Sequence, residues 1–348
     1  MELRGGYKQE LSRKEKSTIN RIVGKYDLQV ETVSKNRSVY KIKTDKNNIC
    51  LKKIKNKKYK VKNGMSLVNE LKLNGFNNTA DYLKTTRDNI MVKYKNIYFY
   101  ATEWIDGREC DMDNQNELIE SIKLLAKFHE CSKKINTKEI KIKNNLGKWP
   151  ESFNKKLHDL DKFKNFIKNK RIKSSFDTKY YEYIDMFYKK GLISLSLLNS
   201  SNYYDLCRND KEYKTICHNS FYYQNIIKKN EEYYLIDLNS IIFDLAIMDL
   251  GKFIRRIMYK KNYRWDFKKA KLIIEAYNSV NKISKDELEI MLALIIFPHK
   301  FWKLGRKKYV RHKNWNELKY SKRIEKIIAY NELEDKFIED FLEYIKNY

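Results

Sequence analysis

Side chains that could bind a metal gather in one short stretch between helical segments. The stretch runs from Thr215 to Leu238, and its two apolar runs, Asn225 to Ile227 and Tyr233 to Ile236, predict a hairpin. Asn225 opens the first strand and Asp237 follows the second, so the hairpin brings an amide oxygen close to a carboxylate. Oxygen ligands of this kind suit Mg²⁺. The spacing therefore predicts a metal held by Asn225 and Asp237.

The residues ahead of the hairpin point to phosphate chemistry. Phosphotransferases of the kinase fold use a loop H-x-D-x-x-x-x-N, in which the Asp orients or deprotonates the acceptor hydroxyl and the Asn holds a metal. His218 and Asn225 match the two ends of this loop, and we interpret His218 as the residue that orients it. Ser220 occupies the position of the catalytic Asp. A hydroxyl is neutral at pH 7 and is too weak a base for this task, so we expect transfer to be impaired.

A lysine and a glutamate upstream complete the candidate nucleotide site. Lys52 lies in a predicted strand where kinases place the lysine that pairs with phosphates, and Glu70 in the next helix is placed to form an ion pair with it. The loop from Ser34 to Ser38 contains no glycine, which works against a close approach of backbone to phosphate. We therefore expect ATP and Mg²⁺ to bind weakly, if at all, through Lys52, Glu70, Asn225 and Asp237.

The elements that position these residues change character along the chain. The first hundred residues predict a helix near Leu11 to Tyr26, strands at Leu28 to Thr32, Val39 to Lys43 and Ile49 to Ile54, a helix around Ser66 to Asn74, and strands at Ile90 to Val92 and Ile97 to Trp104. Long helices follow, the first capped by Asp111 or Asp113 and the others near Phe153 to Asn169, Thr178 to Lys190, Ala270 to Val280, Lys285 to Phe297 and Asn331 to Lys346.

This order predicts an α+β fold with two lobes. We expect a small N-terminal lobe over residues 1–104, with a helix, an antiparallel sheet and one further helix. A connector follows over residues 105–110, and a larger, mainly helical C-terminal lobe covers residues 111–348 with the hairpin of residues 215–238 embedded in it.

Composition narrows the class of protein. The 348 residues are 42% hydrophobic, which is too apolar for a mainly disordered chain, and the longest apolar run, Ile290 to Phe297, is too short to cross a bilayer. The first ten residues lack the apolar segment of a signal peptide, and five cysteines without a CxxC pair indicate synthesis in a reducing cytoplasm. The net charge is +28, but 59 of the 73 basic residues are Lys, which favours a solvated surface over nucleic-acid binding.

One basic stretch departs from this even distribution of charge. His299 to Lys326 holds eleven Lys and Arg against two Glu, with aromatic residues interleaved. Such a stretch can form a platform for an anionic polymer or nucleic acid. We favour the simpler interpretation, a helix pair with a buried aromatic face and solvated lysines.

Several motifs in order along the chain are similar to one known family. They are Leu51-Lys52, Trp104 to Cys110, Leu125 to His129, Cys217-His218 to Asn225, Ile236 to Leu238, Asp249-Leu250 and Phe297 to Leu304. Together they resemble the CotS-type spore coat proteins, a branch of the aminoglycoside phosphotransferase and choline kinase superfamily with a protein-kinase-like fold. The resemblance implies a kinase-like bilobal fold and a location in the spore coat.

The departure at Ser220 favours a pseudokinase, a phosphotransferase relative with impaired catalysis that serves coat assembly or binds coat components or coat polysaccharide. One alternative is an active ATP-dependent kinase that phosphorylates a hydroxyl of a sugar, coat polysaccharide or small molecule. A second is a basic scaffold that binds an anionic coat polymer. Whether Asp244 or Asp249 replaces the missing acid stays open at this point, as does a purely structural role for Asp249 as the cap of a helix beginning near Leu250.

Overall fold

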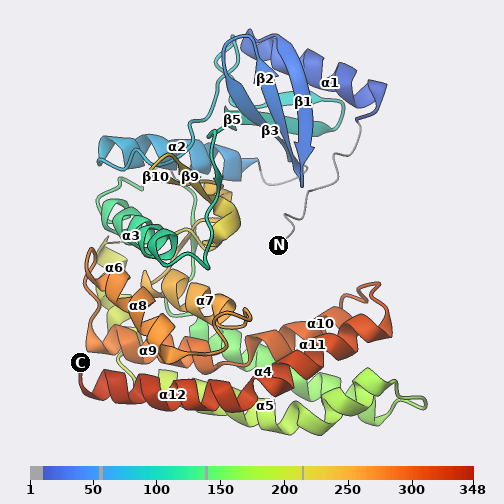
Figure 1. The fold of residues 1–348 in the computed structure, drawn as a ribbon, viewed down its shortest axis with the longest axis vertical. Coiled ribbons are helices and arrows are strands. Elements are labelled where there is room, and N and C mark those ends of the chain that lie inside the picture. The colour runs from blue at the N-terminus through green and yellow to red at the C-terminus, as the bar shows by residue number, and fades with distance from the viewer. Residues whose placement is uncertain (1–10, 55–57, 138–139, 214) are drawn as a thin grey trace. The chain divides into compact units, whose positions relative to one another are not determined.

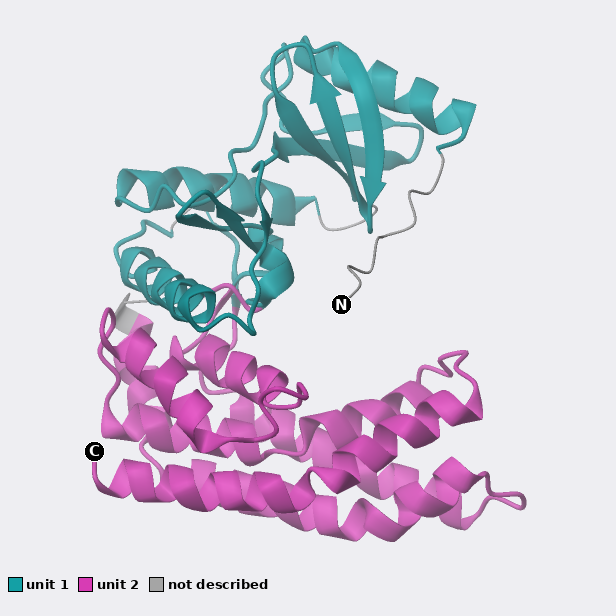
Figure 2. Cartoon of the chain, in the orientation of Figure 1, with its two compact units in different colours: residues 1–143, 220–241 teal, residues 144–219, 242–348 magenta. Residues whose placement is uncertain are grey.

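A computed structural model describes residues 11–54, 58–137, 140–213 and 215–348 (Figure 1). The chain divides into two compact units, drawn in teal and magenta in Figure 2. Unit 1 comprises residues 1–143 and 220–241, and unit 2 comprises residues 144–219 and 242–348. The N-terminal stretch in which we expect no signal peptide, residues 1–10, lies outside the described residues.

Unit 1 is built on a five-stranded antiparallel sheet in the order β1-β2-β3-β5-β4. Its strands are β1 (Val30–Asn36), β2 (Val39–Thr44), β3 (Asn48–Ile54), β4 (Val92–Tyr94) and β5 (Ile97–Glu103). Helix α1 (Arg13–Val23) begins with a capping box between Ser12 and Glu15. Its apolar face joins the inner residues of the sheet, among them Ile42, Ile49 and Leu51, in one buried core. Alternating burial along β2 and helical spacing in α1 explain why both elements were predictable.

The rest of unit 1 surrounds the hairpin. Helix α3 (Gln115–Ser132) packs against strand β10 (Glu232–Leu235) of the hairpin, and helix α2 (Tyr59–Leu73) packs against the short helix η3 (Leu238–Ser240) that follows it (Figure 1). Strand β9 (Ile226–Lys229) pairs with β10 and with β6 (Arg108–Glu109). The expectation that Asp111 or Asp113 caps α3 is wrong. Asn114 is the N-cap, and its side-chain oxygen accepts a hydrogen bond from the Glu117 backbone N–H at 3.1 Å.

Unit 2 is almost entirely helical. It contains α4 (Trp149–Lys168), α5 (Ser175–Ser200), α6 (Tyr203–Tyr213), α7 (Ile247–Ile257), α8 (Phe267–Asn278), α9 (Lys285–Ile296), α10 (His299–Tyr309), α11 (Glu317–Ala329) and α12 (Asn331–Lys346). Two short strands, β8 (Ile216–Cys217) and β11 (Ile242–Phe243), pair antiparallel. The core is rich in aromatic contacts, such as the stacked rings of Tyr180 and Phe301 at 4.1 Å between centroids.

These elements confirm the predicted fold class, an antiparallel sheet in the N-terminal region followed by a mostly helical remainder. The basic stretch forms the expected helix pair, α10 and α11, with Phe301 and Tyr320 buried. The lobe boundary at residues 105–110 stays a prediction. Across the described residues, no helix combines the length and the apolar character needed to span a membrane.

The buried carboxyl group of Asp244 connects the start of α4 to the segment between β11 and α7 through hydrogen bonds. The Asp244 side chain accepts hydrogen bonds from the Trp149 indole N–H at 3.0 Å, from the Asn145 amide at 2.6 Å and from the Leu245 backbone N–H. Asp244 is fully buried, and this burial raises the pKa of its carboxyl group to about 7 despite those donors.

This pKa predicts a pH-dependent contribution to stability. The unfolded chain loses the Asp244 proton near the usual value of 3.8, whereas the folded protein keeps it until about pH 7. The carboxyl therefore stabilises the fold below about pH 4 and loses this contribution as the pH rises through 7. We expect the free energy of unfolding of the natural protein to fall, relative to that of Asp244→Asn, between pH 5 and pH 8. Urea denaturation of both proteins across this range checks it, and a constant difference would contradict it.

Candidate functional site

A pocket of about 550 Å³ in unit 1 collects most of the predicted site residues. It is lined by the β1–β2 turn, by β3, by residues after β5 and by the loops on either side of the hairpin. Lys52, Ser220, Asn225 and Asp237 all line it, although the sequence separates Lys52 from Asp237 by 185 residues. The predicted residues His218 and Glu70 do not line this pocket.

The central contact of this pocket is an ion pair between Lys52 and Asp237. The Lys52 ammonium lies 3.0 Å from Asp237 Oδ1, and the side chains are 16% and 39% exposed. Burial lowers the pKa of Lys52, but the attraction of Asp237 outweighs it, so the pKa is raised overall. Lys52 thus stays protonated and presents a positive charge to the pocket.

The expected ion pair between Lys52 and Glu70 is wrong. Lys52 pairs with Asp237 instead, and Glu70 forms no ion pair with Lys52 in the described part of the chain. The geometry of α2 explains the difference. Gly64 and Val68 are α2 residues that face this site, and Glu70 lies about 9 Å farther along the axis than Gly64 and about 120° around it.

Two tyrosines and an asparagine position the Asp237 carboxylate. Asn239 donates hydrogen bonds to Asp237 Oδ1 at 3.2 Å and to the Tyr100 hydroxyl at 2.6 Å, and it accepts one from the Tyr82 hydroxyl at 3.0 Å. The rings of Tyr82 and Tyr100 stack at 5.9 Å, and burial raises the pKa of both phenols, which keeps both hydroxyls protonated and neutral. Asp237 itself adopts a left-handed backbone conformation with φ of 68°, which Asp tolerates better than most residues.

The two oxygen ligands predicted for a metal are held at the base of the hairpin. The Ile236 N–H donates to the Asn225 carbonyl at 2.9 Å, which brings Asn225 next to the residue preceding Asp237. The Asn225 amide nitrogen donates to the Ser220 carbonyl at 2.9 Å and lies 3.4 Å from the Ser220 hydroxyl. Because the nitrogen is engaged, Oδ1 is the atom of this amide that suits a cation. An amide oxygen with a carboxylate is a donor set that fits Mg²⁺.

The glycine-free turn closes one side of the pocket with side chains. Arg37 and Ser38 connect β1 to β2, and Arg37 has a positive φ of 53°. Its guanidinium forms an ion pair with Glu109 at 2.7 Å. The backbone approach that glycine would allow is thus replaced by a charged side-chain contact.

The remaining predicted acids and His218 lie in unit 2. His218 and Asp244 are fully buried, and Asp249 is 2% exposed. Asp249 Oδ1 accepts the Asn219 backbone N–H at 2.8 Å, so it holds the residue that precedes Ser220. The interpretation of Asp249 as the cap of a helix near Leu250 is wrong, because α7 begins at Ile247 and Asp249 lies in its first turn.

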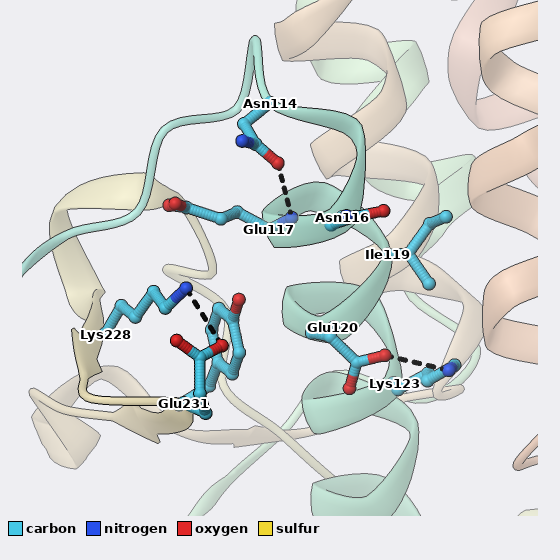
Figure 3. A pocket seen from close by; sticks show the side chains of 9 residues that line it. Asn114, Asn116, Glu117, Ile119, Glu120, Lys123, Lys228 and Glu231 are labelled. Carbon is cyan, nitrogen blue, oxygen red and sulfur yellow. Dashed lines mark hydrogen bonds and ion pairs between the residues drawn. The ribbon is translucent and has the colours of Figure 1, made fainter.

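A second hollow in unit 1, of about 580 Å³, lies between α3 and the β9–β10 hairpin (Figure 3). Its charged groups largely neutralise one another: Lys123 pairs with Glu120 at 2.8 Å, and Lys228 pairs with Glu231 at 3.2 Å. This hollow contains none of the predicted site residues.

The antiparallel sheet and the helical remainder define a protein of the kinase-like fold. The chain belongs to the family described as "Spore coat putative kinase YutH", which matches residues 19–341.

One curated protein is similar in sequence, and two solved structures share the fold. Spore coat protein S of Bacillus subtilis (strain 168) is 25% identical over 249 residues, which cover 70% of this chain and 69% of that protein. The crystal structure of an aminoglycoside phosphotransferase from Alicyclobacillus acidocaldarius superposes with a TM-score of 0.82 at 17% identity, covering all of both chains. Amicoumacin kinase hAmiN, in complex with AMP-PNP, Ca²⁺ and Ami, superposes with a TM-score of 0.62 at 13% identity over 92% of this chain and 93% of that chain.

The packing of Tyr82 and Asn239 near Asp237 makes Gly64 sensitive to substitution. A Cβ at Gly64 would overlap the Tyr82 hydroxyl and lie 3.0 Å from Asn239 Oδ1. Tyr82 is stacked and hydrogen-bonded, so it has little freedom to move away. We expect Gly64→Ala to lower the free energy of unfolding by about 1–3 kcal/mol, measured by urea denaturation.

Gly24→Ala is the matched control for this substitution. Gly24 has ordinary helical angles, and no heavy atom lies within 4 Å of the position that an added methyl group would take, so Ala should be neutral or stabilise by up to about 1 kcal/mol. Equal stabilities of the two variants would show that the network around Asp237 is not tightly packed.

Proposed function

We propose that this protein is a pseudokinase of the spore coat, which binds Mg²⁺ and ATP weakly in the unit 1 pocket and transfers phosphate poorly or not at all. The observation that carries the proposal is the composition of one pocket. Lys52, Asn225 and Asp237 line it, and Ser220 stands there in place of a catalytic carboxylate. Membership of the spore coat family supports the location in the coat.

The lining of the pocket suits the parts of a nucleotide. Val39, Val68 and Ile105 give it apolar walls that suit a purine base, and Lys52 supplies a positive charge for phosphate oxygens. Mg²⁺, held by Asn225 and Asp237, would neutralise further phosphate charge. Amicoumacin kinase, which shares the fold, binds AMP-PNP with Ca²⁺, and this supports the same class of ligand here.

The Lys52–Asp237 ion pair and the glycine-free turn both oppose tight binding. A phosphate must compete with Asp237 for the Lys52 ammonium, and the Arg37–Glu109 pair occupies the edge where a flexible loop would fold over phosphates. We therefore expect nucleotide to bind weakly.

Ser220 limits catalysis. It is half-buried, and its carbonyl and hydroxyl receive the Asn225 amide. A positioned base is typically worth about 10²–10⁴ in rate, and a neutral hydroxyl supplies neither charge nor proton affinity. Asp244 and Asp249 are buried and hydrogen-bonded in unit 2, so the proposal assigns neither of them the role of the missing base.

Nucleotide binding is tested by a thermal-shift titration. We expect Mg²⁺ with ATP at millimolar concentration to raise the melting temperature of the natural protein by a few degrees, because a ligand of the folded state stabilises it. Lys52→Met should abolish the shift. Lys53→Met is the control, since Lys53 follows on the same strand and does not line the pocket. A shift that survives Lys52→Met would place the nucleotide elsewhere, and no shift at all would favour a scaffold without nucleotide.

The role of Ser220 is tested by restoring the carboxylate. We expect the natural protein to release almost no ADP from ATP, with water or spore coat polysaccharide as the acceptor, and Ser220→Asp to raise the rate by at least about tenfold. Ser220→Asn matches the shape of Asp without its charge and should stay inactive. Robust turnover by the natural protein, unchanged in Ser220→Asp, would establish an active kinase instead. Nucleotide binding without turnover in any variant would favour a ligand-stabilised coat scaffold.

A further inference from the structure

Helix α10 in unit 2 carries basic side chains along one side. Lys300, Lys303 and Lys307 recur every three or four residues, and Arg306 lies beside Lys307, which places all four on one stripe of the helix. The intervening residues Phe301, Trp302, Leu304 and Gly305 are buried. We call these four basic residues the cationic stripe. An 11-residue helix is about 16 Å long, so the stripe presents one or two basic groups per turn over that length.

Neighbouring helices add cations to the stripe. Lys156 of α4 lies 5.5 Å from the centre of the Trp302 ring, and Arg306 lies 5.4 Å from the same ring. At the other end, Lys307 and Arg323 of α11 both lie over Trp315, at 4.6 and 4.5 Å. The tryptophans therefore link cations of α4, α10 and α11 into one continuous track.

Carboxylates do not balance this charge. Among the described residues, Lys156, Lys300, Lys303 and Lys307 form no ion pair with an acid. Burial, and then the charges of Arg255 and Lys252, lowers the pKa of Lys156 to about 7. Burial, and then Lys326 and Arg255, lowers the pKa of Lys300 to about 6. The acids that do lie nearby are occupied or buried: the Trp302 indole N–H donates to Asp159 at 2.8 Å, and Glu334 is 4% exposed.

We propose that the cationic stripe, with Lys156 and Arg323 at its two ends, is a binding surface for a linear acidic polysaccharide. A bound polyanion would supply the negative charge that the stripe lacks, and it would favour the protonated forms of Lys156 and Lys300. The extended series of single charges matches a polymer with regularly spaced carboxylates better than one small anion. This inference concerns unit 2 alone and does not depend on nucleotide binding.

The Trp302 and Trp315 rings are covered by other side chains, and this favours a polysaccharide over other polyanions as the ligand. Single-stranded nucleic acid binds strongly when bases stack on exposed aromatic rings, and a folded protein partner needs exposed aromatic or aliphatic anchors. Here Trp302 is 8% exposed and Trp315 is half-buried beneath Lys307, Lys319 and Arg323. The exposed side chains of α10 and α11 are mainly Lys, which attracts anions without reading a base, although Leu318 is 60% exposed.

The test measures binding of polygalacturonate, with neutral dextran, polyglutamate and a single-stranded DNA of similar charge as comparisons. The natural protein should bind polygalacturonate more tightly than the other three polymers, and its affinity should fall steeply with NaCl concentration. The variant Lys303→Ala/Lys307→Ala should bind it at least about tenfold more weakly at 0.1 M salt and show a shallower salt dependence.

The matched control removes two charges elsewhere in the same unit. Lys162 and Lys168 are exposed on α4 and form no ion pair in the described residues, so Lys162→Ala/Lys168→Ala should change the affinity by less than about twofold. Equal losses in both double variants would show that net charge, and not the stripe, binds the polymer, and would overturn the proposal. Tighter binding of DNA or polyglutamate would overturn the choice of polysaccharide. Lys52→Met should bind polygalacturonate normally, which separates failure of this proposal from failure of nucleotide binding.

Discussion

The ion pair between Lys52 and Asp237 is the contact on which the unit 1 site depends. It joins a strand of the N-terminal sheet to the loop after the hairpin, and both of its members line the pocket. A partly buried lysine is destabilising without a nearby negative charge, and Asp237 offsets this cost at the position of Lys52. Asn239, Tyr82 and Tyr100 in turn fix the Asp237 carboxylate. The metal and phosphate chemistry that we propose requires this carboxylate to stay in place.

Much of the fold follows from local patterns. Strands β2 and β3 and helix α1 have the periodicities expected of a sheet and helix that share one core, and the hairpin strands were visible as short apolar runs between polar turns. The same reasoning brings Asn225 near Asp237, because each residue flanks one strand of a tight hairpin. The predicted third strand locates Lys52 correctly, whereas the predicted partner of Lys52, Glu70, is wrong.

Long-range packing accounts for what the sequence did not reveal. Tyr82 and Asn239 are 157 residues apart and Tyr100 and Asn239 are 139 apart, so no local spacing marks their hydrogen bonds. The partner of Lys52 depends on how α2 packs against the rest of unit 1, and the close approach of Tyr82 to Gly64 is one contact of that packing. The cap of α3 was misplaced because Asp111, Asp113 and Asn114 are all good capping residues, and only the geometry selects Asn114.

In our proposal, the kinase-like fold keeps Lys52, Asn225 and Asp237 as nucleotide and metal ligands but has Ser220 where a catalytic carboxylate would stand. The protein would then bind nucleotide without transferring phosphate efficiently. The central claim is that nucleotide binds through a metal held by Asn225 and Asp237. Isothermal titration calorimetry of ATP with and without Mg²⁺ tests this claim most directly. We predict weak binding that requires Mg²⁺ and disappears in Asp237→Asn. Tight binding of ATP in the absence of a divalent metal, unchanged by Asp237→Asn, would contradict it.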